Sequence, residues 1–257
     1  MSAQGKFAWY ELLTTDTAAA GSFYSSVVGW STHSVGSPEM PYTTFNLGPT
    51  GIAGMLTLPK EASAMGQPPS WIGYIHVDDV DAYVAKVVAA GGAIHKPATD
   101  VPGMLRFAVV ADPQGVSFVL FTGNPAMPTP PKPAAGSPGT IGWHELMAVD
   151  GAAAFAFYSS QYGWSKTRDF DMGPMGNYLL FAIDGVETGG MMTKPPNLPA
   201  AFWSFYFNVD AIGAAIERIK AGGGNVVNGP MQVPGGQWIV QATDPQGAFF
   251  ALVSYNA

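Results

Sequence analysis

At two places in this 257-residue chain a glutamate follows a tryptophan by two positions, and these glutamates are the side chains best suited to proton transfer. Glu11 stands in the run Trp9-Tyr10-Glu11-Leu12, and Glu145 stands in Trp143-His144-Glu145-Leu146. A carboxylate in apolar, aromatic surroundings is costly unless it is hydrogen-bonded, and burial raises its pKa towards the range of a general base. Glu11 and Glu145 are therefore candidate catalytic residues. The alternative is a structural carboxylate held by backbone N–H groups or a neighbouring tyrosine.

The two glutamates belong to a repeat that runs through the whole chain. Phe23-Tyr24 and Gly29-Trp30 recur as Phe157-Tyr158 and Gly163-Trp164, at the same offset of 134 (145 − 11) as the glutamates. Further along, Trp71 and Asp112-Pro113-Gln114-Gly115 recur as Trp203 and Asp244-Pro245-Gln246-Gly247, at an offset of 132 (203 − 71). A register kept over so many positions indicates a tandem duplication.

Each copy carries two strand–helix–strand patterns that would position these residues. In the first copy a strand is predicted at 7–13, and a helix follows it between Asp16 and Gly29. A second strand at 71–77 leads into a helix that Asp78 caps and Gly91-Gly92 ends. Short apolar segments separated by Gly and Pro, at 42–47, 52–58, 104–111 and 116–121, predict further strands. Each copy is thus two βαβββ modules, and the fold class is α+β.

A proline-dense stretch lies between the copies. Proline lacks a backbone donor and favours extended geometry, so residues 124–138 predict a semi-rigid linker. The predicted domains are 1–123 and 139–257.

The composition excludes several classes of function. Lys and Arg number 11 against 18 Asp and Glu, a formal net charge of −7, and no basic cluster is present, so nucleic acid is not an expected partner. There is no Cys and therefore no disulfide or thiolate site. Neither a signal-peptide core nor an apolar run of about 18 residues is found, so no membrane association is expected and a cytoplasmic location is the default. The oligomeric state is not indicated.

The chain resembles the vicinal oxygen chelate superfamily in four motifs that occur in the same order in both copies. They are the Phe-Tyr pair, the Gly-Trp pair, the Val-Asp entry to the second helix and the Asp-Pro-x-Gly turn. That superfamily includes glyoxalase I, bleomycin-resistance proteins, fosfomycin-resistance enzymes and extradiol dioxygenases. The resemblance covers nearly all of the chain outside the linker. It implies that the two modules of each copy form a cupped sheet around a cleft.

The resemblance also implies where a metal would be held. The three ligand positions of metal-dependent members fall on Trp9, Ile72 and Val119 in the first copy. In the second copy they fall on Trp143, Ser204 and Ala251, and a fourth position, a glutamate in the family, falls near Gly54 and Gly190. None of these side chains offers an imidazole nitrogen or a carboxylate oxygen. We therefore expect no metal and no other cofactor.

Strand alternation predicts which side chains line the cleft, because residues two apart share one face of a strand. Trp9 would share its face with Glu11, and Trp143 with Glu145. The predicted ligand-binding residues are Trp9, Tyr74 and His76 in the first copy and Trp143, Tyr206 and Asn208 in the second. His144 lies on the opposite face from Trp143, where a structural role is expected.

An aromatic, mostly apolar cup with a few polar groups is typical of sites for small amphipathic molecules. The leading hypothesis is a protein of the glyoxalase and bleomycin-resistance type that binds a small aromatic or amphipathic molecule without the usual metal. One alternative is a lyase or dioxygenase that uses Glu11 or Glu145 as base, or an unrecognised metal site. Another is a structural or partner-binding protein whose cups are filled by their own side chains, Trp9 and Trp143 included.

Overall fold

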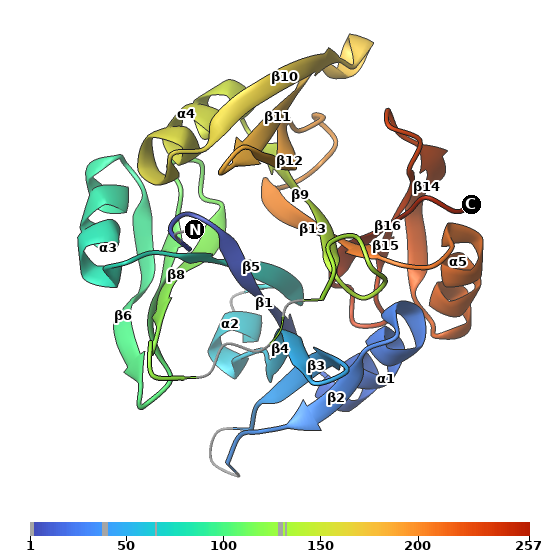
Figure 1. Ribbon diagram of the computed structural model, residues 1–257, viewed down its shortest axis with the longest axis horizontal. Coiled ribbons are helices and arrows are strands. Elements are labelled where there is room, and N and C mark those ends of the chain that lie inside the picture. Colours follow the sequence, from blue (N-terminus) through green and yellow to red (C-terminus); the bar gives the residue numbers. More distant parts are fainter. Residues whose placement is uncertain (1–2, 38–40, 65, 128–130, 132) are drawn as a thin grey trace. The chain divides into compact units, whose positions relative to one another are not determined.

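The computed structural model describes residues 3–37, 41–64, 66–127, 131 and 133–257, and its strands form two eight-stranded sheets (Figure 1). The first sheet has the order β2-β3-β4-β1-β5-β8-β7-β6, and the second repeats it as β10-β11-β12-β9-β13-β16-β15-β14. Both are mixed, since β1 runs parallel to β4 whereas β3 runs antiparallel to it. The predicted α+β class, with two βαβββ modules in each copy, is confirmed.

The elements of the first copy are β1 (Phe7–Thr14), α1 (Thr17–Val28), β2 (Ser31–Ser34), β3 (Thr43–Leu47), β4 (Thr50–Thr57), α2 (Lys60–Ala64), β5 (Ser70–His76), α3 (Val80–Ala89), β6 (Ala93–Val101), β7 (Leu105–Ala111) and β8 (Ser117–Gly123). Those of the second copy are β9 (Ile141–Ala148), α4 (Gly151–Tyr162), β10 (Ser165–Asp171), the 3-10 turn η1 (Gly173–Met175), β11 (Asn177–Ile183), β12 (Val186–Thr193), β13 (Phe202–Asn208), α5 (Ile212–Ala221), β14 (Asn225–Gln232), β15 (Trp238–Thr243) and β16 (Phe249–Ser254). No helix within the described residues is long and apolar enough to cross a membrane.

The first helix of each copy begins and ends where the sequence predicts. The Asp16 carboxylate accepts the backbone N–H of Ala19 at 2.9 Å, and Gly29 ends α1 with a φ of 90°, in the left-handed region that favours glycine. The predicted cap of the second helix was wrong by one residue, because Asp79 and not Asp78 accepts the N–H of Ala82, at 3.0 Å. Starting at Val80 lets α3 bury that valine against the sheet.

The sequence did not indicate one strand in each module. These strands, β2, β6, β10 and β14, form the outer edges of the two sheets. Most of their residues are exposed and none is buried, so they lack the alternation of buried and exposed residues from which strands are predicted. Their place is decided by backbone pairing with the neighbouring strand.

The chain packs into two compact units that do not coincide with the two copies. One unit consists of Met1–Trp9, Ile72–Thr129 and His144–Trp203, and the other of Tyr10–Trp71, Pro130–Trp143 and Ser204–Ala257. Each unit therefore combines one module from each copy, whereas each sheet is built from one copy. The predicted domain limits at 123 and 139 stay a prediction, and residues 128–130 and 132 of the predicted linker lie outside the described residues.

A buried chain of hydrogen bonds joins the two modules of the second unit. The Trp71 indole N–H donates to the Tyr24 hydroxyl at 2.9 Å, and that hydroxyl donates to Asp244 Oδ2 at 3.1 Å. The other oxygen of Asp244 accepts the backbone N–H groups of Gln246 and Ala248, which shapes the Asp-Pro-Gln-Gly turn. Burial raises the pKa of Asp244, and it raises the pKa of Tyr24 well above its ordinary value.

The first unit repeats this chain with the roles of the copies exchanged. Trp203 donates to the Tyr158 hydroxyl at 3.0 Å, and Tyr158 donates to Asp112 Oδ2 at 3.2 Å. The tryptophan of the Gly-Trp pair also bonds to the other copy. Trp30 donates to the carbonyl of Gly139 and Trp164 donates to the carbonyl of Gly5, both at 2.7 Å. The residues that carry the family resemblance thus form buried contacts between the two copies.

Tyr24→Phe should test the importance of this chain for stability. The change leaves the Trp71 N–H without its acceptor in a buried position and removes one donor from Asp244, so the free energy of unfolding should fall by about 1–3 kcal/mol. Urea denaturation measures the loss, and Tyr158→Phe should give a similar value. The control is Tyr255→Phe, because Tyr255 is 73% exposed. A loss in Tyr24→Phe no larger than in this control would contradict the importance of the chain.

Candidate functional site

Glu11 lies in the middle of β1, and its carboxylate is held by a tyrosine. Its side chain is only 7% exposed, and Oε2 accepts a hydrogen bond of 3.1 Å from the Tyr42 hydroxyl. Tyr42 immediately precedes β3, which pairs with β4, and β4 in turn pairs with β1. The strand order therefore brings this tyrosine over the glutamate, two strands away.

A glycine makes room for the tyrosine ring. Gly54 on β4 is the register partner of Glu11 across the parallel pair. A Cβ added to Gly54 would collide with the Tyr42 phenol, so the ring lies directly over this position. This is where the family resemblance predicts a ligand glutamate. A phenol hydroxyl occupies the space instead, next to Glu11.

The second copy repeats the register pair and the tyrosine ring over the glycine. Gly190 on β12 is the register partner of Glu145, which is also 7% exposed. A Cβ on Gly190 would collide with the phenol of Tyr178 on β11. Tyr42 and Tyr178, like Gly54 and Gly190, are separated by 136 positions (190 − 54). We call Glu11, Tyr42 and Gly54, and likewise Glu145, Tyr178 and Gly190, the Glu–Tyr–Gly elements.

The other positions that the family resemblance implies for metal ligands carry no side chain suited to coordinate a metal ion. Val119 is buried as the register partner of Tyr74, and Ala251 is buried as that of Tyr206. Ser204 is buried, with a hydroxyl for which no hydrogen-bond partner is found among the described residues. Within the described part of the chain no three His, Cys, Asp or Glu side chains come together in a way that could hold a metal ion.

Two predicted ligand-binding residues of the second copy pack together. Trp143 is half-buried against a cluster that contains Tyr206, Ala251 and Val253. The Tyr206 hydroxyl accepts a hydrogen bond of 2.8 Å from the amide nitrogen of Gln241. The cluster is therefore an aromatic surface with one polar pair at its edge.

His76 and Asn208 occupy equivalent strand ends but have different surroundings. The Asn208 amide nitrogen donates to Thr140 Oγ1 at 2.9 Å, which ties this side chain to the start of its own copy. His76 lies edge-on to Phe121, with ring centroids 5.5 Å apart, and its buried Nδ1 has no hydrogen-bond partner among the described residues. Burial lowers the pKa of His76, against the opposing effect of Asp78. Of the first-copy candidates, Tyr74 is buried and Trp9 is half-buried.

Comparison with known proteins decides the family. The model of the Glyoxalase/Bleomycin resistance protein/Dioxygenase superfamily matches residues 6–120 and again residues 140–252. The chain belongs to this superfamily. It contains the family domain twice, in agreement with the two sheets and with the resemblance read from the sequence.

Relatives of similar length exist within the superfamily. "Putative glyoxylase CFP32" of Mycobacterium tuberculosis is 33% identical over 258 residues, covering 97% of this chain and 95% of the relative. "Anthracycline biosynthesis protein DnrV" of Streptomyces peucetius is 29% identical over 262 residues, covering 98% and 94%. The Mn(II)-bound glyoxalase from Novosphingobium aromaticivorans has a similar structure, with a TM-score of 0.68 at 15% identity, covering 100% of this chain and 84% of that one. At that identity the likeness concerns the fold alone.

Sequence reasoning missed Tyr42, Tyr178 and Gln241. A signal for the tyrosines was present, because each precedes a phenylalanine by three positions, in Tyr42-Thr43-Thr44-Phe45 and Tyr178-Leu179-Leu180-Phe181. Their role depends on which strands are neighbours in the sheet, and the local periodicity of a sequence does not predict strand order. Gln241 has Val109 at the equivalent position of the first copy, so the repeat itself did not point to it.

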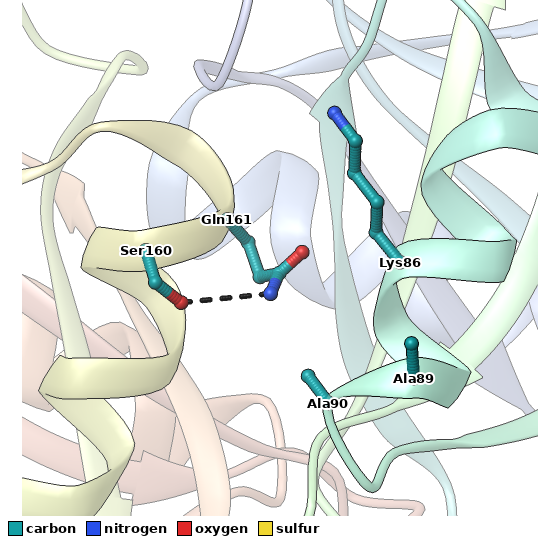
Figure 2. A pocket seen from close by; sticks show the side chains of 5 residues that line it. All are labelled: Lys86, Ala89, Ala90, Ser160 and Gln161. Carbon is teal, nitrogen blue, oxygen red and sulfur yellow. Dashed lines mark hydrogen bonds between the residues drawn. The ribbon is translucent and has the colours of Figure 1, made fainter.

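The first unit has a surface hollow between α3 and α4, lined by Lys86, Ala89, Ala90, Ser160 and Gln161 (Figure 2). At the position equivalent to Lys86 the second copy has Arg218, which donates to the carbonyl of Val27 at 3.0 Å. Lys86 instead lies over the Tyr83 ring, 4.0 Å from its centroid. The hollow thus reflects a packing difference between the copies.

His144 lies among buried groups, as the alternation on its strand predicts. Its ring stacks on Phe7 with centroids 4.4 Å apart, and Nδ1 lies 2.9 Å from the carbonyl oxygen of Thr188. Burial lowers the pKa of His144 to about 4, partly offset by the bond to Thr188. The imidazole is therefore neutral at pH 7.

His144 should make stability depend on pH in acid. Its pKa is about 4 in the folded state against an ordinary 6.5, so the unfolded chain takes up this proton first as the pH falls. Its contribution is complete above pH 6.5 and declines until about pH 4, a loss of roughly 3 kcal/mol. His144→Gln should flatten the fall in unfolding free energy between pH 7 and 5, measured in urea.

A matched surface change separates this effect from other titrating groups. His95 is exposed on β6, so His95→Gln is the matched surface variant. His144→Tyr is a second variant, because Tyr10 occupies the equivalent position in the first copy. An unchanged slope in both His144 variants would mean that His144 is not the responsible group.

Proposed function

We propose that this protein binds a small aromatic or amphipathic molecule at its Glu–Tyr–Gly elements, without the metal that many superfamily members use. The observation that carries the proposal is the buried carboxylate of Glu11 with its hydrogen bond from Tyr42. A buried carboxylate is costly to keep, and a polar group set among aromatic side chains is the usual way in which a site orients a small ligand.

The side chains at the implied metal positions support the metal-free part of the proposal. Trp, Ile, Val, Ser and Ala give no set of imidazole or carboxylate donors, and a tyrosine ring fills the space over Gly54 and Gly190. The aromatic character of the ligand is supported by a relative, because DnrV is named for anthracycline biosynthesis.

Metal analysis of the purified protein tests the first part. After incubation with Zn²⁺, Ni²⁺, Mn²⁺ or Fe²⁺ and extensive dialysis, we expect well below one equivalent per chain, because no strong donor set is available. Elemental analysis by mass spectrometry gives the value. One tightly bound equivalent that survives dialysis would overturn this part of the proposal.

Titration calorimetry with planar aromatic compounds, including a hydroxylated anthraquinone, tests binding. We expect saturable binding with a Kd below about 100 µM, and a Kd in the Glu11→Gln, Glu145→Gln double variant that is weaker by about tenfold to a hundredfold, the range for a lost hydrogen bond to a charged group. Glu217→Gln is the control, because it removes the same charge from a side chain that is 74% exposed. Binding to none of the compounds would favour a structural protein whose cups are filled by their own side chains.

A second candidate function is a lyase or isomerase in which Glu11 or Glu145 acts as general base. The name of one relative, "Putative glyoxylase CFP32", favours it, and a buried carboxylate suits the role. The glutamine variants separate the two functions. A base is required for turnover but not for affinity, so a substrate whose conversion disappears in Glu11→Gln while its binding remains would establish the enzyme.

A further inference from the structure

We propose that the hollow between α3 and α4 is a second ligand site, which takes a small molecule through a carboxylate or phosphate group. Its volume is about 390 Å³, within the range of small-molecule sites. All the residues that line it belong to the first unit, and none of them is part of a Glu–Tyr–Gly element. The inference therefore goes beyond the proposed function and does not depend on it.

The second unit contains the equivalent pair of helices, α5 and α1, and shows what occupies the space there. Arg218 corresponds to Lys86, and its guanidinium donates to the carbonyl oxygen of Val27 at 3.0 Å. The ring of Phe23 lies so close to Gly222 that a Cβ at this glycine would come within 2.8 Å of it. Protein side chains therefore take up the space between these two helices.

The first unit keeps the space open through differences at the end of α3. Ala90 stands in place of Gly222, and its methyl group excludes a phenylalanine ring placed as Phe23 is. Lys86 stands in place of an arginine, and its ammonium lies over the Tyr83 ring, 4.0 Å from the centroid. The second copy has an alanine at the position of this tyrosine. The hollow thus follows from residue types that the equivalent helix pair lacks.

The groups that line the hollow favour an anion. Lys86 on α3 carries a positive charge, and Gln161 on the facing helix α4 carries amide N–H donors (Figure 2). The Gln161 amide nitrogen is 3.5 Å from Ser160 Oγ, at the limit of a hydrogen bond. No Asp or Glu lines the hollow. An ammonium and an amide on opposite walls suit an oxyanion, because hydrogen bonds to a charged group are the stronger ones.

The end of α3 does not favour a cation in the same place. The last carbonyl groups of a helix carry partial negative charge when they have no partner. Here the carbonyl groups of residues 86–88 accept the backbone N–H groups of residues 90–92, at 2.9–3.0 Å. The Lys86 ammonium is therefore the main charge at the hollow.

Small aliphatic probes test this site, because they lack the aromatic ring that the proposed function requires. Acetate and inorganic phosphate are the oxyanions, tetramethylammonium is the cation and acetamide is the neutral control. NMR of the full-length protein, isotope-labelled in its alanine methyl groups, follows Ala89 and Ala90 at constant ionic strength. We expect saturable shifts of both signals with the oxyanions and none with the other two probes. The tighter oxyanion indicates which group the natural ligand carries.

Two variants of Lys86 separate a built site from simple attraction of charge. Lys86→Gln removes the charge and should weaken oxyanion binding at least about tenfold, as expected for a lost hydrogen bond to a charged group. Lys86→Arg keeps the charge but introduces the residue of the second unit, whose guanidinium should fill the hollow and weaken binding to a similar extent. Lys220→Gln is the control, because its side chain is 60% exposed on α5, and it should leave binding unchanged.

Three results would each overturn the proposal. Undiminished oxyanion binding by Lys86→Arg would mean that charge alone attracts the anion. Saturable shifts with tetramethylammonium in place of the oxyanions would mean that the hollow attracts cations. Shifts that do not saturate with any probe would mean that the hollow is a packing difference and nothing more. None of these results affects the metal analysis or the aromatic titrations, which test the proposed function separately.

Discussion

The structure depends on a hydrogen-bond chain in which a tryptophan, a tyrosine and an aspartate from different copies meet in the core. Tyr24 reaches Asp244 across 220 residues of sequence, and Tyr158 reaches Asp112 across 46. Each polar atom in this chain is buried, so a missing partner would leave a donor or acceptor unsatisfied at a cost of about 1–3 kcal/mol. The two copies are therefore bound to each other by groups that cannot be exposed cheaply.

This constraint explains why the two copies do not fold as independent consecutive domains. A single copy contains the tyrosine and the aspartate of the motif, yet each bonds to its counterpart in the other copy. The compact units follow these contacts and combine one module from each copy, whereas the hydrogen-bonded sheets follow the copies. The motifs that identify the superfamily are thus the residues that hold modules together, and they carry no information on the ligand.

The functional elements are arranged on this framework by strand order. Glu11 and Gly54 are register partners, as are Glu145 and Gly190, and the ring of Tyr42 or Tyr178 lies over the glycine. In the first copy the Tyr42 phenol occupies the space over Gly54, a position that the family resemblance implies for a metal ligand, and donates a hydrogen bond to Glu11.

The sequence alone determined the duplication, the α+β class, the helix cap at Asp16, and the lack of donor groups at positions such as Ile72 and Val119, because these follow from residue type and local spacing. It also singled out Glu11 and Glu145, whose type is unusual on an apolar strand. Only the tertiary structure decided that Tyr42 and Tyr178 lie over Gly54 and Gly190, that the edge strands form, and that modules pair between copies. These features arise from contacts between strands and helices far apart in the chain. Such contacts leave no periodic pattern in the residues that make them.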